Sequence, residues 1–107
     1  TQKDGTFWVM NYFYPGDDHL AAEDDPLISQ YGIGETHKQF DGVERIVEMK
    51  IEEGAIRLVN IAPLYLRLNS DGVSRNWEGI VRLDEIGFLL ITDSFPRTIF
   101  GFVQDLR

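Results

Sequence analysis

The chain of 107 residues contains 43% apolar and 26% charged residues, a composition typical of one folded globular domain. It has no cysteine, which excludes a disulfide scaffold, a thiolate zinc site and a cysteine nucleophile. The net charge of −8 repels phosphate groups, and no apolar run approaches the roughly 20 residues that span a bilayer, so we expect neither nucleic-acid binding nor membrane insertion.

Short apolar or alternating segments predict six or seven β-strands in one domain that covers residues 1–107. The first strand, residues 6–14, is rich in aromatic and β-branched side chains. Residues 43–51 alternate between a largely apolar and a more charged face, and the Glu53-Gly54 pair predicts a tight turn into residues 55–61. Further strands are expected at residues 64–68, 79–83, 87–92 and 98–103. The regular spacing predicts an all-β fold of antiparallel sheets.

Residues 15–42 interrupt this spacing as a long, acidic connection that contains both histidines, His19 and His37. One helical turn is expected at residues 26–31, because Pro26 suits a first helical turn and Gly32 can end it. A loop of this length in so small a domain is either functional or a solvated insertion, and both readings stay open.

A repeat relates two of the predicted strands. The segments that begin at Gly5 and Gly87, 82 residues apart, both contain a glycine, an apolar strand and then Asn11 or Asp93. An aromatic residue and a proline follow each copy. Propeller blades contain four strands in about 40–50 residues, so this separation corresponds to two blades. Coincidence between aromatic strands is the alternative.

Residues 76–83 read Asn-Trp-Glu-Gly-Ile-Val-Arg-Leu, and residues 87–99 read Gly-Phe-Leu-Leu-Ile-Thr-Asp-Ser-Phe-Pro-Arg-Thr-Ile. This stretch resembles the C-terminal end of bacterial phytase-like, or esterase-like, β-propeller proteins. Residues 4–16 and 43–48 resemble their preceding blade. The resemblance covers most of the chain and implies antiparallel sheets equivalent to about two blades. It also favours a bacterial periplasmic or secreted protein over a cytoplasmic one.

A complete propeller of this kind has several hundred residues, so two blades would leave open strand edges and uncovered faces. Three explanations follow: the chain associates with copies of itself, it is a fragment of a longer propeller, or it is a small independent sheet fold. We expect a homo-oligomer. The aromatic candidates to cover a shared apolar surface are Trp8, Trp77, Phe88 and Phe100, and ordinary core packing is the alternative for each.

The resemblance also implies a metal site. Glu78 precedes a glycine at the start of an apolar strand, where a carboxylate is costly unless it is paired or metal-bound. In the similar gluconolactonase-type propellers, such a Glu holds a divalent cation together with Asn and Asp from other blades. By this resemblance Glu78, Asn11 and Asp93 would bind Ca²⁺ or Mg²⁺, which prefer oxygen ligands. The alternative is a structural Glu78 that pairs with Arg75, Arg82 or Arg97.

Two further residues are candidates for catalysis. His37, with Glu35 nearby as a carboxylate partner, has the chemistry of a general base. Arg97 follows a Phe-Pro turn and has the charge to contact an anionic substrate. An exposed loop side chain is the alternative for both residues.

Two functions are consistent with these patterns. The first is a self-associating, β-propeller-like binding or structural module that also takes a small-molecule ligand. The second is a divalent-metal-dependent phosphoester or ester hydrolase of the phytase-like or gluconolactonase-like kind. The first is favoured because about four blades of a usual six-bladed site are missing from these 107 residues.

Overall fold

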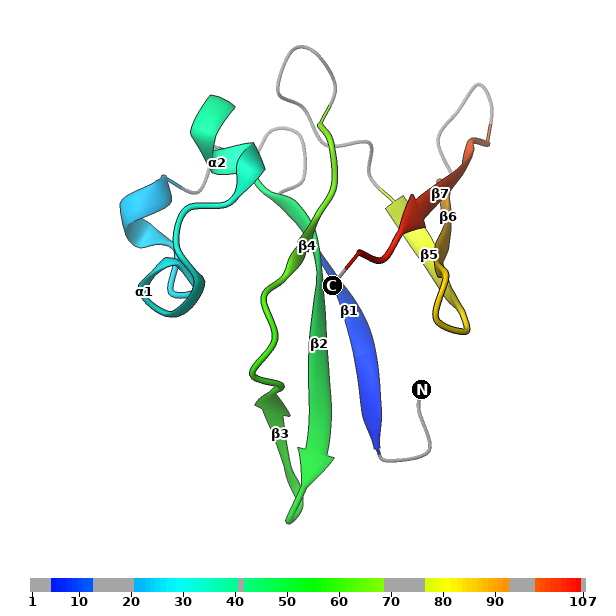
Figure 1. Cartoon of the computed structure of the whole chain (residues 1–107), viewed down its shortest axis with the longest axis horizontal. Helices are drawn as coiled ribbons and strands as arrows, with labels where there is room; N and C mark the ends of the chain where they lie inside the picture. Colours follow the sequence, from blue (N-terminus) through cyan, green and yellow to red (C-terminus); the bar gives the residue numbers. More distant parts are fainter. Residues whose placement is uncertain (1–4, 13–20, 41, 69–76, 93–97, 107) are drawn as a thin grey trace.

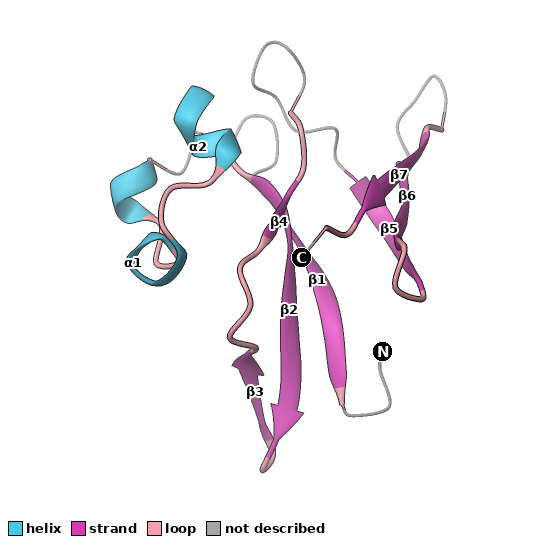
Figure 2. Cartoon of the chain, in the orientation of Figure 1, coloured by secondary structure: helices cyan, strands magenta, loops and turns pink. Residues whose placement is uncertain are grey.

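The computed structural model describes residues 5–12, 21–40, 42–68, 77–92 and 98–106. In these residues the chain forms two antiparallel β-sheets and a few short helical turns (Figure 1, Figure 2). The all-β prediction is confirmed: the first sheet has four strands and the second sheet has three.

The first sheet has β2 (Glu44–Glu52) at its centre. The strand β1 (Thr6–Tyr12) pairs with one side of β2, and β3 (Ala55–Leu58) and β4 (Leu64–Tyr65) pair with different parts of its other side. The β2–β3 turn is the predicted Glu53-Gly54 pair. These residues have φ values of 53° and 77°, and positive φ at both positions matches the twist of a two-residue hairpin.

The second sheet is a meander of β5 (Trp77–Leu83), β6 (Gly87–Thr92) and β7 (Phe100–Gln104). A β-bulge between Trp77 and Gly79 shifts the register of β5. Side chains alternate along a regular strand, so the extra residue turns Trp77 to the same face as Ile80. The sequence predicted the β6 bounds correctly, but it placed the next strand two residues too early.

Predicted strands at residues 55–61 and 64–68 are shorter in the structure. Ile61 donates a backbone hydrogen bond to Val59, which forms a tight turn where the first strand was expected to continue. Pro63 has no N–H group to offer to a neighbouring strand. The paired register with β2 therefore ends at Leu58, with one more backbone hydrogen bond from Val59 N to Glu48 O, and it resumes at Leu64.

Residues 21–40, the helical segment, contain η1 (Ala22–Asp24), α1 (Ile28–Tyr31) and α2 (Glu35–Gln39). The sequence predicted only the turn that became α1. The helical segment lies on the side of the first sheet that faces away from the second sheet (Figure 1). It buries Asp25, Leu27 and Thr36, so this part of the expected insertion is packed against the domain. Helices in the described ranges are too short and polar to cross a membrane.

The hydrophobic core lies between the two sheets. Its fully buried members come from both sheets, and partly buried side chains of β1, β4, β5 and β7 pack around them. The Trp8 and Phe88 rings meet edge to face, with centroids 5.5 Å apart. Trp77 and Phe88 are core residues, so the expectation that they cover a shared surface is wrong. The buried cluster consists of Ile46, Leu66, Trp77, Phe88 and Leu90.

Candidate functional site

A buried ion pair joins the helical segment to the first sheet. Arg45 Nη1 donates to Asp25 Oδ2 across 2.6 Å, and Arg45 Nη2 donates to Asp25 Oδ1 across 3.1 Å. The Leu27 backbone N–H donates to Oδ1 at 3.0 Å, and His37 Nε2 lies 2.9 Å from Oδ2. Asp25 is thus held by four contacts from three residues.

Arg45 is satisfied on its other side by the sheet. Its Nε donates to Asn11 Oδ1 across 2.8 Å, and its Nη1 donates to the Tyr65 hydroxyl across 3.2 Å. The guanidinium carbon also lies 5.8 Å from the centre of the Tyr65 ring. We call Asn11, Asp25, His37, Arg45 and Tyr65 the polar cluster.

The polar cluster keeps Asp25 ionised. Burial by itself raises the pKa of the Asp25 carboxyl, but the Arg45 hydrogen bonds and charge, the Leu27 N–H and His37 together hold it below its ordinary value of 3.8. An ionised carboxylate only accepts hydrogen bonds, so the His37 Nε2–H is the donor in their contact. Among the described residues, nothing pairs with the buried Nδ1 of His37.

The polar cluster has the properties of a structural link between the helical segment and the first sheet. The Asp25 and His37 side chains have no exposed surface, so a substrate cannot touch them in this arrangement. The carboxylate beside His37 is Asp25, 12 residues earlier in the chain. The expected partner, Glu35, has a side chain that lies outside the described structure. The role of His37 as a general base stays a prediction.

The Asp25–Arg45 pair was not predicted from the sequence, although one signal pointed to it. Arg45 interrupts an otherwise apolar face of residues 43–51, and a buried guanidinium requires a carboxylate or several acceptors. The sequence did not identify which carboxylate of the acidic segment would supply the charge.

The predicted metal ligands are not brought together by the described part of the chain. Glu78 is exposed beside the β5 bulge, and the Asn11 side-chain oxygen accepts a hydrogen bond from Arg45. Asp93, Arg75 and Arg97 lie outside the described residues. Within those residues, groups of three or more acidic or histidine side chains with metal-binding geometry are absent. Arg82 pairs with Asp105 at 2.6 Å, so it is not the predicted partner of Glu78. The Ca²⁺ or Mg²⁺ site stays a prediction.

An apolar surface covers the outer side of the second sheet. Val81 pairs with Leu89 and Leu89 pairs with Phe102, so these three side chains form one row across β5, β6 and β7. The next row on the same face contains Ile91 and Phe100. Val81, Phe100 and Phe102 are 58%, 72% and 52% exposed. We call these five residues the second-sheet outer face.

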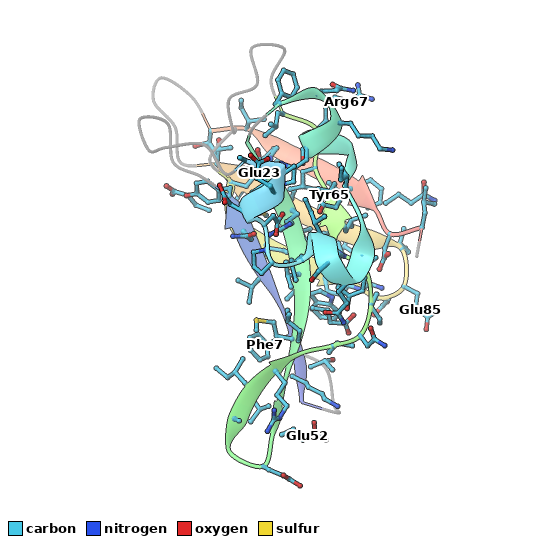
Figure 3. All side chains as sticks on the ribbon, turned by 90° about the vertical axis from the view of Figure 1, so that its left-hand side faces the viewer. Phe7, Glu23, Glu52, Tyr65, Arg67 and Glu85 are labelled. Atoms are coloured by element: carbon cyan, nitrogen blue, oxygen red, sulfur yellow. The ribbon has the colours of Figure 1, made fainter. Side chains whose placement is uncertain are left out.

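A second apolar surface lies on the outer side of the first sheet. The register places Phe7 opposite Met49, Met49 opposite Leu58, and Ile51 opposite Ile56. The helical segment covers the upper part of this side, near Tyr65, whereas Phe7 lies below it (Figure 3). Ile51 and Ile56 are 61% and 63% exposed. These five residues form the first-sheet outer face.

A groove of about 390 Å³ runs beside β1 and β5. It is lined by apolar side chains and by Arg82, whose guanidinium carbon lies 5.3 Å from the Trp8 ring and 4.8 Å from the Phe88 ring. Its volume is within the range of small-molecule pockets. The expected small-molecule ligand stays a prediction. The lining residues are Phe7, Trp8, Ile51, Ile80 and Arg82.

The chain was compared with protein-family models, with curated proteins and with solved structures, and none of these comparisons found a match.

Proposed function

We propose that the chain is a self-associating β-sheet module with a binding or structural role, and that its second-sheet outer face packs against another copy. The observation that carries this proposal is the exposed row of Val81, Leu89 and Phe102 across all three strands. Soluble proteins rarely leave a contiguous apolar patch of this kind in water without a binding role.

The exposed area supports a protein partner. An aromatic side chain offers roughly 150–250 Å² in full, so Phe100 and Phe102 together leave on the order of 250 Å² of apolar surface in water. With the aliphatic neighbours of the same face, this area matches the apolar centre of an interface that buries about 800 Å² on each partner.

A second copy of the chain is the favoured occupant. Each copy carries a net charge of −8, and the second-sheet outer face is formed entirely of uncharged side chains. Two copies can therefore meet there without placing carboxylates opposite one another. Stacking of sheet on sheet, about 10 Å apart, would cover the face along its whole length. Salt should strengthen the association by screening the remaining repulsion.

The propeller-like description is part of this proposal. Two small antiparallel sheets that pack around a shared core, the second of them a three-stranded meander, are what two blades would form. Blades cover one another by the same stacking that we propose between copies.

The test is the mass of the chain in solution across a concentration series, measured by sedimentation or by light scattering after size exclusion. We expect the parent to reach at least twice its 12.3 kDa mass. Phe102→Ser should raise the dissociation constant about ten-fold or more, which is about 1.4 kcal/mol. Ile33→Ser is the matched control, because Ile33 is 53% exposed but lies in the helical segment.

Two results would contradict the proposal. One is a parent chain that stays at 12.3 kDa at all concentrations and salt levels. The other is an equal effect of Phe102→Ser and Ile33→Ser. Circular dichroism of each variant shows whether the sheets are intact.

A further inference from the structure

We infer that the association is head to tail, with the second-sheet outer face of one copy seated on the first-sheet outer face of the next. This inference rests on the proposed function and adds the identity of the receiving surface. It also predicts the form of the assembly, because a head-to-tail contact either closes into a ring or continues as a filament.

The two outer faces point away from each other. Ile46 of β2 and Leu90 of β6 both point into the shared core. Side chains alternate along a strand, so the neighbours of these residues point outward on opposite sides of the domain. Each copy therefore carries one apolar face on each side of the two-sheet stack, although Phe7 and Ile51 of the first-sheet outer face also border the groove beside β1 and β5.

A two-fold contact between second sheets would leave the first-sheet outer face uncovered. Ile51 and Ile56 would remain exposed in such a dimer, although they pair directly across β2 and β3. A head-to-tail contact covers both faces of every copy in a closed ring. The hydrophobic effect is roughly proportional to the apolar area removed from water, so it favours the arrangement that buries both faces.

The side chains of the two faces are also complementary. The second-sheet outer face exposes two aromatic rings, Phe100 and Phe102, beside the aliphatic Val81. The first-sheet outer face exposes branched aliphatic side chains, chiefly Ile51 and Ile56. Rings of one face can lie between aliphatic side chains of the other, as inner-face side chains interdigitate in sheet sandwiches.

The experiment uses two variants of the whole chain, each with one damaged face. Phe102→Asp places a charge on the second-sheet outer face, and Ile56→Asp places one on the first-sheet outer face. Head-to-tail association predicts that each variant alone is monomeric or nearly so. It also predicts that an equimolar mixture forms a heterodimer, because the mixture offers one intact face of each kind. Ile33→Asp is the control and should associate like the parent.

The outcomes separate this inference from the proposed function. If Phe102→Asp is monomeric while Ile56→Asp associates like the parent and the mixture yields no heterodimer, the proposed function holds and the head-to-tail inference is wrong. If the parent itself is monomeric, or Phe102→Asp has no effect, both are wrong. Should Ile56→Asp fail to fold, Ile56→Thr is the substitute, because it keeps the β-branched shape. We expect Ile56→Thr to weaken self-association about ten-fold relative to the parent chain.

Discussion

Arg45 and Asp25, which are 20 residues apart in the sequence, form a bidentate ion pair whose shorter contact is 2.6 Å. The Asp25 side chain is fully buried and that of Arg45 nearly so. The pair links the helical segment to the first sheet, and Leu27, His37, Asn11 and Tyr65 complete its hydrogen bonds.

Replacement of Asp25 by Asn should destabilise the fold by about 3–5 kcal/mol, because Arg45 would keep its charge in a buried place without a counter-ion. Urea unfolding measures this cost. The matched control is Glu52→Gln, which breaks the half-exposed Lys50–Glu52 pair at 3.1 Å. That pair should contribute only about 0.2–1 kcal/mol. Equal losses in the two variants would show that the Asp25–Arg45 pair has no special role.

The same carboxylate should make stability depend on pH in acid. The pKa of Asp25 in the folded chain lies below its ordinary value of 3.8, so the unfolded chain binds more protons between the two values and stability rises with pH there. The contribution is present above pH 3.8 and is lost as the pH falls through the lower, folded-state pKa. The stability difference between the parent and Asp25→Asn should therefore shrink from about pH 6 to about pH 2. A constant difference would contradict this assignment.

Much of the fold could be predicted because strands have a local signature. Alternation along residues 43–51 located β2, and the Glu53-Gly54 pair located its hairpin turn. The bounds of β6 were also correct. The α2 helix was not predicted, since five residues carry too little periodic pattern and its position depends on contacts with the first sheet.

The site was less predictable, because its parts meet only in three dimensions. The sequence identified His37 and Asn11 as polar residues of interest, but it assigned them to different sites. The fold brings both to the polar cluster through Asp25 and Arg45. The aromatic residues were similarly ambiguous: Phe88 became core, whereas Phe100 became exposed, because alternation fixes the face of a side chain only once the register is known.

Trp77 packs over Gly101 of β7, and this packing requires that residue 101 has no side chain. A Cβ atom at Gly101 would come within 2.7 Å of Trp77 Cη2, closer than atoms pack. Gly101→Ala should therefore destabilise the second sheet by about 1–3 kcal/mol, measured by urea unfolding. In a Trp77→Leu background the same change should cost much less. A cost that is equal in both backgrounds would rule out the contact as the cause.

Glu53 offers a way to stabilise the chain. Its φ of 53° is left-handed, a conformation that costs most residues about 1–2 kcal/mol and that Asn adopts more readily. Because the turn also has Gly54 in place, Glu53→Asn would complete the Asn-Gly pair that two-residue hairpins favour. We expect a gain of a few tenths to about 1 kcal/mol in the free energy of unfolding.

The control for this change is Glu52→Asn, which removes the same charge one residue earlier, inside β2. Asn is unfavourable in strands, so this variant should be neutral or less stable than the parent. An equal gain in both variants would mean that relief of the net charge of −8, and not the backbone conformation of the turn, raises stability. A gain confined to Glu53→Asn would tie the β2–β3 hairpin, which carries Ile51 and Ile56 of the first-sheet outer face, to the geometry of its turn.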